Sequence, residues 1–101
     1  MHVHATLVTL RDPTTIDRCA ALMSSMTGRI PGLIRLEVTR NELAEPHACD
    51  LALTTTWVDL DAYLAYKTDP VHVAVATEVR ALMTSATTLD HTVEADAVSG
   101  P

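Results

Sequence analysis

Alternating apolar and polar residues mark four segments of the chain as strands. The segment at residues 33–40 has the cleanest period of two, with Ile34, Leu36 and Val38 separated by polar side chains. The first segment is apolar on both of its faces, and a strand of that kind needs a cover on each side. The predicted strands cover residues 2–10, 33–40, 50–57 and 84–94.

Apolar residues at helical spacing predict three helices between these strands. The first helix has a buried stripe that includes Ile16 and Met23. The last helix begins at Asp69-Pro70, where the aspartate can accept a hydrogen bond from the first turn and the proline lacks the N–H that would stay unpaired. The predicted helices cover approximately residues 15–26, 60–67 and 70–83.

The order of these elements, β-α-β-β-α-α-β, predicts an α+β fold. It is the ferredoxin-like arrangement, in which helices cover one face of a four-stranded antiparallel sheet. The other face would be bare and apolar, so we expect a second copy to cover it and form a dimeric α+β barrel. We assign residues 1–95 to this single domain and residues 96–101 to a loose tail.

Composition and charge narrow the range of partners. The 101 residues carry a formal net charge of −6, which argues against binding to nucleic acid. Cys19 and Cys49 form no Cys-x-x-Cys motif, and the N-terminal segment lacks the pattern of a signal peptide, so we expect a cytoplasmic protein. No apolar run is long enough to predict a membrane span.

The corner between the last two helices holds the strongest candidate chemistry. His72 lies on the same helical stripe as Val75 and Val79, so it faces the core. Burial and the helix N-terminus both favour the neutral ring, which can accept a proton. Tyr66, at the end of the preceding helix, could donate to an oxyanion in the same space. A purely structural buried histidine would produce the same pattern, and both interpretations stay open.

Polar side chains that share one face of the predicted sheet form a second part of this candidate site. His4, Thr6 and Val8 share one strand face, and Asp90 stands in the middle of the last strand, where aspartate is disfavoured. We expect these side chains to meet the helix that carries His72 in an apolar cavity. His2 lies on the same strand face as His4, but so close to the first residue that we interpret it as incidental.

Between His4 and Glu94 the chain resembles the stress-responsive α/β barrel (Dabb) family. The order and spacing of several short segments carry this resemblance: His4, Ile30-Pro31-Gly32, Glu45-Pro46-His47, Asp50-Leu51-Ala52-Leu53, Tyr66, Asp69-Pro70-Val71-His72 and Asp90. It implies a ferredoxin-like fold and a homodimeric barrel. Many members have no known reaction, and some are known as stable, stress-induced proteins.

One characterised member, the plant olivetolic acid cyclase, closes a poly-β-keto thioester by an aldol reaction without a cofactor. The resemblance places its catalytic histidine and tyrosine at His72 and Tyr66. A strand histidine and a strand aspartate of its pocket fall at His4 and Asp90. This chain departs from the family at Asp69, where a histidine is common, and it has few aromatic residues to line a pocket.

The predicted function is therefore proton abstraction alpha to a carbonyl, in an aldol-type cyclase or a lyase acting on a small hydrophobic keto substrate. Asp90 or His4 would hold the tautomer of the catalytic imidazole. No cofactor and no metal are predicted. The predicted catalytic residues are His72 and Tyr66, and the predicted substrate-binding residues are His4, Thr6, Val8, Leu53, Val75 and Asp90.

Three alternatives remain. The first is a non-catalytic dimer that responds to stress or binds a small ligand. The second is a cofactor-free monooxygenase on a similar dimeric barrel, against which the scarcity of aromatic residues weighs. The third is a metal site of His4, His72 and Asp90, although no local ligand spacing supports it. The expected partners are a second copy and a small-molecule substrate, with no nucleic acid and no membrane.

Overall fold

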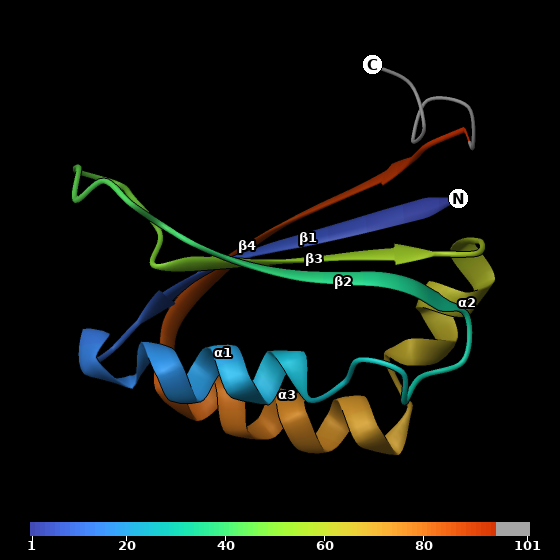
Figure 1. The fold of residues 1–101 in the computed structure, drawn as a ribbon, viewed down its shortest axis with the longest axis horizontal. Coiled ribbons are helices and arrows are strands. Elements are labelled where there is room, and N and C mark those ends of the chain that lie inside the picture. Colours follow the sequence, from blue (N-terminus) through green and yellow to red (C-terminus); the bar gives the residue numbers. More distant parts are fainter. Residues whose placement is uncertain (95–101) are drawn as a thin grey trace.

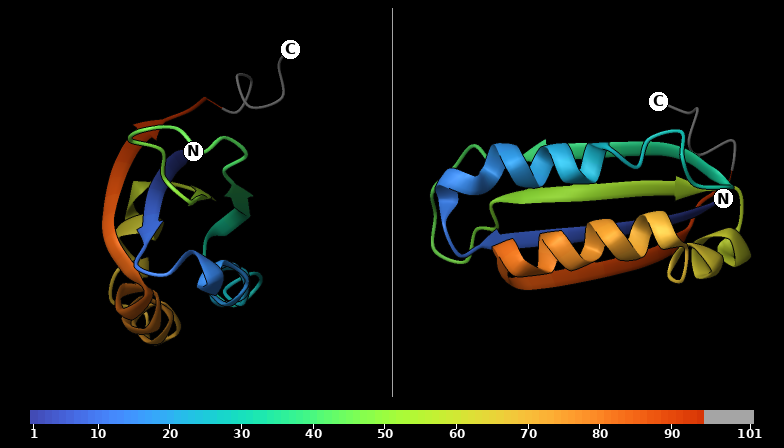
Figure 2. Two further views of the ribbon diagram at one scale, coloured as in Figure 1. Left: turned by 90° about the vertical axis from the view of Figure 1, so that its left-hand side faces the viewer. Right: turned by 90° about the horizontal axis from the view of Figure 1, so that it is seen from below.

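Four antiparallel strands form one sheet, and two long helices lie side by side against one of its faces (Figure 1; Figure 2). The computed structural model describes residues 1–94, so the predicted tail at 96–101 lies outside the described residues. The elements are β1 (His2–Leu10), the short 3-10 helix η1 (Pro13–Thr15), α1 (Ile16–Ser24), β2 (Leu33–Arg40), β3 (Leu51–Trp57), α2 (Leu60–Tyr66), α3 (Pro70–Leu82) and β4 (Met83–Thr92).

The strand order β2-β3-β1-β4 confirms the predicted ferredoxin-like sheet. β1 is a central strand that pairs antiparallel with both β3 and β4. In this register His4 lies opposite Asp90, and Thr6 lies opposite Thr88. Since alternate residues of a strand share a face, these four side chains all point to the helix side of the sheet.

The core lies between the sheet and the helices α1 and α3. Its buried side chains come from β1, β3, the three α-helices and the segment after α1, whereas β2 and β4 contribute only partly buried residues. Trp57, Leu51 and Cys19 have no exposed surface. α1 ends two residues earlier than predicted, at Ser24, but Met26 in the turn that follows is still buried. The buried hydrophobic residues are Val8, Leu10, Cys19, Ala20, Met23, Met26, Ile30, Leu51, Leu53, Trp57, Tyr63, Tyr66, Val75 and Val79.

Two capped helix starts shape the corner between α2 and α3. The Asp59 side chain accepts a hydrogen bond from the backbone N–H of Ala62 at 2.8 Å, and this bond begins α2. The Asp69 side chain accepts from the backbone N–H of Val71, also at 2.8 Å, and Pro70 follows as the first residue of α3. The break between them leaves α2 at the end of the sheet while α3 runs beneath it (Figure 1).

Gly32 allows the chain to enter β2 close against α2. Its φ of +80° lies in the left-handed region that glycine adopts without strain. A Cβ at this position would lie 2.6 Å from the Cβ of Ala62, too close for any L side chain. A larger residue would therefore push β2 and α2 apart at the end of the sheet where the corner begins.

The second face of the sheet is uncovered within residues 1–94 (Figure 1). Leu7 and Leu89 lie on it and are 40% and 60% exposed. The sequence predicted a cover for both faces, and the described part of the chain supplies only one. No helix in this part of the chain is both long and apolar enough to cross a membrane.

Candidate functional site

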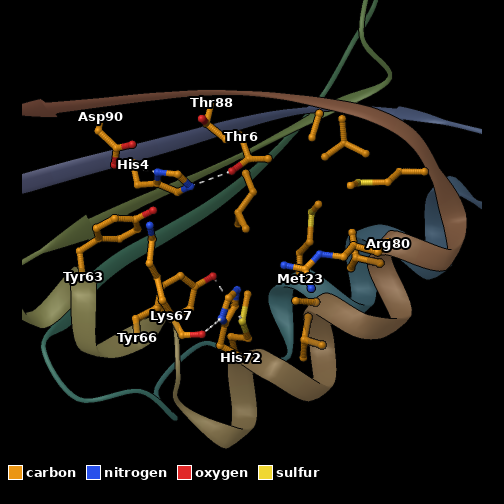
Figure 3. Close-up of a pocket in the computed structure, with 18 residues that line it drawn as sticks. His4, Thr6, Met23, Tyr63, Tyr66, Lys67, His72, Arg80, Thr88 and Asp90 are labelled. Carbon is orange, nitrogen blue, oxygen red and sulfur yellow. Dashed lines mark hydrogen bonds and ion pairs between the residues drawn. The ribbon is translucent and has the colours of Figure 1, made fainter.

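A pocket of about 500 Å³ opens between the helix side of the sheet and the helices α2 and α3 (Figure 3). Its size is within the range of pockets that hold small organic ligands. One wall comes from β1, β3 and β4, and the other from α1, the α2–α3 corner and α3. All eight residues predicted from the sequence line it: His4, Thr6, Val8, Leu53, Tyr66, His72, Val75 and Asp90.

His72 lies in the first turn of α3, half-buried, with its ring held by the backbone. Its Nδ1–H donates to the carbonyl of Lys67 at 3.3 Å, which leaves Nε2 as the nitrogen that can accept a proton. Burial lowers the pKa of His72, and the charges of Arg80 and His4 act in the same direction. These effects outweigh the Lys67 carbonyl and the Asp69 carboxylate, which favour the charged ring. The ring is therefore neutral near neutral pH.

Tyr66 packs directly against this histidine. The centroids of the two rings are 3.9 Å apart. The Tyr66 hydroxyl donates to the sulfur of Met26 at 3.8 Å, and a thioether is a weak acceptor. Burial, with a smaller contribution from Tyr63, raises the pKa of Tyr66 to about 12. The hydroxyl therefore keeps its proton near neutral pH and can donate it to a stronger acceptor.

The polar wall opposite His72 is one connected hydrogen-bond network. The His2 Nε2–H and His4 Nδ1–H groups donate to the same Asp90 oxygen at 2.9 and 2.8 Å. The Thr6 hydroxyl donates to Nε2 of His4 at 3.0 Å. Burial alone would raise the pKa of Asp90, but the hydrogen bonds and charges of the two histidines together lower it. Asp90 is therefore ionised near neutral pH.

Two predictions about this wall are wrong. Asp90 and His4 do not hold the tautomer of His72, because the Lys67 carbonyl occupies its Nδ1. His2 is not incidental: it is 6% exposed and donates to Asp90, although it is not among the residues that line the pocket. The sequence interpretation discounted His2 for its position near the first residue, although the strand alternation already put it on the same face as His4.

Tyr63 is a pocket residue that the sequence analysis missed. Its ring stacks on His4 with the centroids 4.6 Å apart, and it also approaches His2 and Trp57. The chain has one tryptophan, two tyrosines and no phenylalanine, and all three aromatic side chains meet at this end of the core. The signal was available, because Tyr63 and Tyr66 are three residues apart and share one face of α2.

Lys67 and Arg80 also line the pocket and were not predicted. Arg80 follows His72 by eight residues, a spacing that returns to the same side of a helix. Lys67 is the C-cap residue that follows α2, and its ammonium lies over the ring of Tyr63, 5.5 Å from the centroid. Both are charged residues with exposed surface, which the hydrophobic pattern assigns to solvent.

The described residues contain neither a cluster of metal-ligating side chains nor a disulfide. Among residues 1–94, no three histidine, cysteine, aspartate or glutamate side chains are grouped so that they could hold a metal ion. Cys19 is buried in the core and Cys49 is half-buried in the loop before β3, and both are free thiols.

Comparison with known proteins identifies a family to which nearly the whole chain is similar. A family model described as the stress responsive A/B barrel domain matches residues 3–93. No curated protein matches the chain. A dimeric protein of unknown function and ferredoxin-like fold from Bacteroides fragilis superposes with a TM-score of 0.77 at 21% identity, covering 91% of this chain and 95% of the other.

Two further solved structures with the same fold carry named activities. A hydroxynitrile lyase from Passiflora edulis superposes with a TM-score of 0.79 at 12% identity, covering 93% of this chain and 94% of the other. SnoaB, a cofactor-independent oxygenase from Streptomyces nogalater, superposes with a TM-score of 0.69 at 21% identity, covering 92% of each chain. At these identities the likeness is one of fold.

Proposed function

The chain belongs to the stress-responsive A/B barrel family, and from this premise we propose that its pocket catalyses proton abstraction alpha to a carbonyl, in a lyase or an aldol-type cyclase. One observation carries the proposal. The neutral His72 ring, fixed through Nδ1 to the Lys67 carbonyl, lies in an open pocket against the protonated Tyr66. A base and an oxyanion donor on adjacent rings are the two groups that enolate formation needs.

The proposed step uses side chains of the pocket alone. Nε2 of His72 accepts the proton from the carbon next to the carbonyl. The Tyr66 hydroxyl leaves the sulfur of Met26 and donates to the oxygen on which negative charge develops, which is a much stronger acceptor. The apolar side chains Val8, Leu53 and Val75 exclude water around the hydrocarbon part of a small keto substrate.

Deuterium exchange tests this step without knowledge of the natural substrate. Propiophenone and benzylacetone are incubated with the protein in D₂O, and loss of the alpha-proton signal is followed by NMR. His72→Asn removes the base, and we expect exchange to slow by about 10²- to 10⁴-fold. Tyr66→Phe removes only the donor oxygen, and we expect a loss of about 10²-fold or more.

His47→Asn is the matched control. His47 is an exposed histidine in the loop before β3, outside the pocket, and its φ of 69° is one that asparagine tolerates. It should exchange protons as the wild type does. If His72→Asn also keeps the wild-type rate, His72 is not the base, and the pocket is better described as the binding site of a non-catalytic protein.

A cofactor-independent oxygenase is the second candidate, favoured by the structural likeness to SnoaB. Such a reaction can also begin with proton removal by a neutral histidine. Oxygen uptake in the presence of a hydroquinone separates the two candidates. Uptake that His72→Asn abolishes would favour the oxygenase over the lyase or cyclase.

We also propose that the protein is a homodimer in which a second copy covers the uncovered face of the sheet. Several structural neighbours are described as dimeric, including those from Bacteroides fragilis and Thermobifida fusca. Leu7 and Leu89 expose apolar surface on that face. Burying this surface would stabilise the pair by about 25 cal/mol for each Å² removed from water.

A further inference from the structure

The pocket carries an excess of positive charge in a chain whose net charge is −6. Lys67 and Arg80 are cationic at neutral pH, whereas Asp90 is the one acidic residue within residues 1–94 that lines the pocket. A cleft with one sign of charge concentrates ligands of the opposite sign. The charge around this opening therefore differs in sign from the protein as a whole.

Neither of these cations has an ion-pair partner within residues 1–94. Asp90, the acidic residue of the pocket, is already engaged by His2 and His4. Three of the five arginines outside the pocket are each paired with a carboxylate: Arg18 with Glu78, Arg35 with Glu37, and Arg40 with Asp17. The charges of the two pocket cations are thus not neutralised by a carboxylate, and the Lys67 ammonium contacts only the face of the Tyr63 ring among the interactions of residues 1–94.

Both cations extend toward the space beside His72. Arg80 begins about 12 Å further along α3, and long helical side chains lean back toward the helix N-terminus, which here means toward His72. Its charge is felt by His72, whose pKa it helps to lower. Figure 3 shows Lys67 and Arg80 on the two sides of His72, each with its charged end in the pocket.

We infer that the pocket binds an organic acid whose carboxylate lies between Arg80 and Lys67. The Arg80 guanidinium can donate two parallel hydrogen bonds to one carboxylate, and the Lys67 ammonium adds a second charge. The apolar wall of Val75, Val79 and Met83 holds the carbon chain. The proposed function requires that a carbonyl group of the same ligand faces His72, and this part of the inference rests on it. A ligand with both a carbonyl and a carboxylate is a keto acid, which is the substrate class that we infer.

Binding of a matched pair of ligands tests the inference. β-Benzoylpropionate carries a ketone and a carboxylate, and its amide has nearly the same shape without the charge. Both are titrated into the full chain by isothermal calorimetry, in the His72→Asn background so that no turnover occurs. Because both cations are partly exposed and screened by water, we expect the acid to bind about tenfold more tightly than the amide. Added NaCl should reduce this preference.

Variants that each remove one charge then show which side chain causes the preference for the acid. Arg80→Gln and Lys67→Gln should each reduce the difference between acid and amide, with the larger loss at Arg80. Arg29→Gln is the control, since it removes the same charge from an exposed loop residue outside the pocket. It should leave the preference unchanged, although the net charge changes equally.

Three outcomes would overturn the inference. They are equal binding of acid and amide, a preference that persists in both pocket variants, and no binding of either ligand. None of them bears on the proton-transfer proposal, which the exchange of neutral ketones tests separately. Conversely, a preference for the acid that depends on Arg80 supports the carboxylate site even if His72 proves not to be a base.

Discussion

The chemistry proposed for His72 follows from its neighbours. The unperturbed pKa of a histidine side chain is about 6.5, so near that pH only about half of the protein molecules would carry the neutral ring that can act as a base. Here burial and the charge of Arg80 lower the pKa, and the Lys67 carbonyl fixes which nitrogen carries the proton. The side chain is therefore both neutral and oriented before any substrate arrives.

The direction of this shift can be measured directly. In an NMR titration the pKa of His72 should lie below 6.5, and Arg80→Gln should raise it, since that variant removes one of the causes that lower it. Activity that depends on neutral His72 should fall as the pH decreases through this pKa. Arg29→Gln should leave the titration of His72 unchanged. A pKa at or above 6.5 in the wild type would contradict the description of the ring as buried and neutral.

At the level of residues, period-two alternation was enough to find the polar wall. It placed His4, Thr6 and Asp90 on one face because neighbouring side chains of a strand must point to opposite sides. The same rule was available for His2 and was set aside. Lys67 and Arg80 were missed for another reason: a charged residue at a helix surface can face solvent or a cleft, and only the packing of α3 against the sheet decides which.

At the level of elements, the start of α3 controls the position of His72. Asp69 caps the helix at Val71, one residue before the histidine, and Pro70 fixes the backbone of the first turn. Such local signals depend only on neighbouring residues, and the sequence therefore predicted this corner correctly. The end of α1 was placed less well, since the turns that follow Ser24 also bury apolar side chains.

Removing the cap at Asp69 should weaken the corner. Asp69→Ala deletes the acceptor for the Val71 N–H, and we expect the free energy of unfolding to fall by about 1 kcal/mol. For a domain of this size the melting temperature should drop by roughly 4–8 °C. Thermal melts at one fixed protein concentration measure this. Asp69→Asn keeps a capping oxygen and should lose much less, whereas equal losses in both variants would mean that the charge stabilises the helix start.

At the level of the whole molecule, the sheet divides the protein into a pocket side and an uncovered side. The side with the helices could be predicted because it follows from the order of the elements. The bare face was expected to need a second copy because its strands are apolar on both faces. The part of the pocket that α2 adds through Tyr63 and the adjoining Lys67 required the three-dimensional packing of α2 at the end of the sheet.

A charge on the bare face should break the proposed dimer. Leu89 lies on this face in the edge strand β4 and is 60% exposed, and Leu89→Asp would place a carboxylate in the interface. Size-exclusion chromatography with light scattering should report a dimer for the wild type and a monomer for this variant. Leu43→Asp is the control, because Leu43 is 64% exposed in the loop before β3, away from the sheet. A monomeric wild type at micromolar concentration would contradict the dimer.

β1 serves both sides of the sheet with alternate residues. His4 and Thr6 belong to the pocket, whereas Ala5 and Leu7 belong to the bare face. Substitutions can accumulate on one side without disturbing the other, so the proposed substrate binding and the proposed assembly are free to diverge separately. Insertion or deletion of a single residue would exchange the two sets and shift the pairing with both neighbouring strands. The length of this strand is therefore more constrained than its composition.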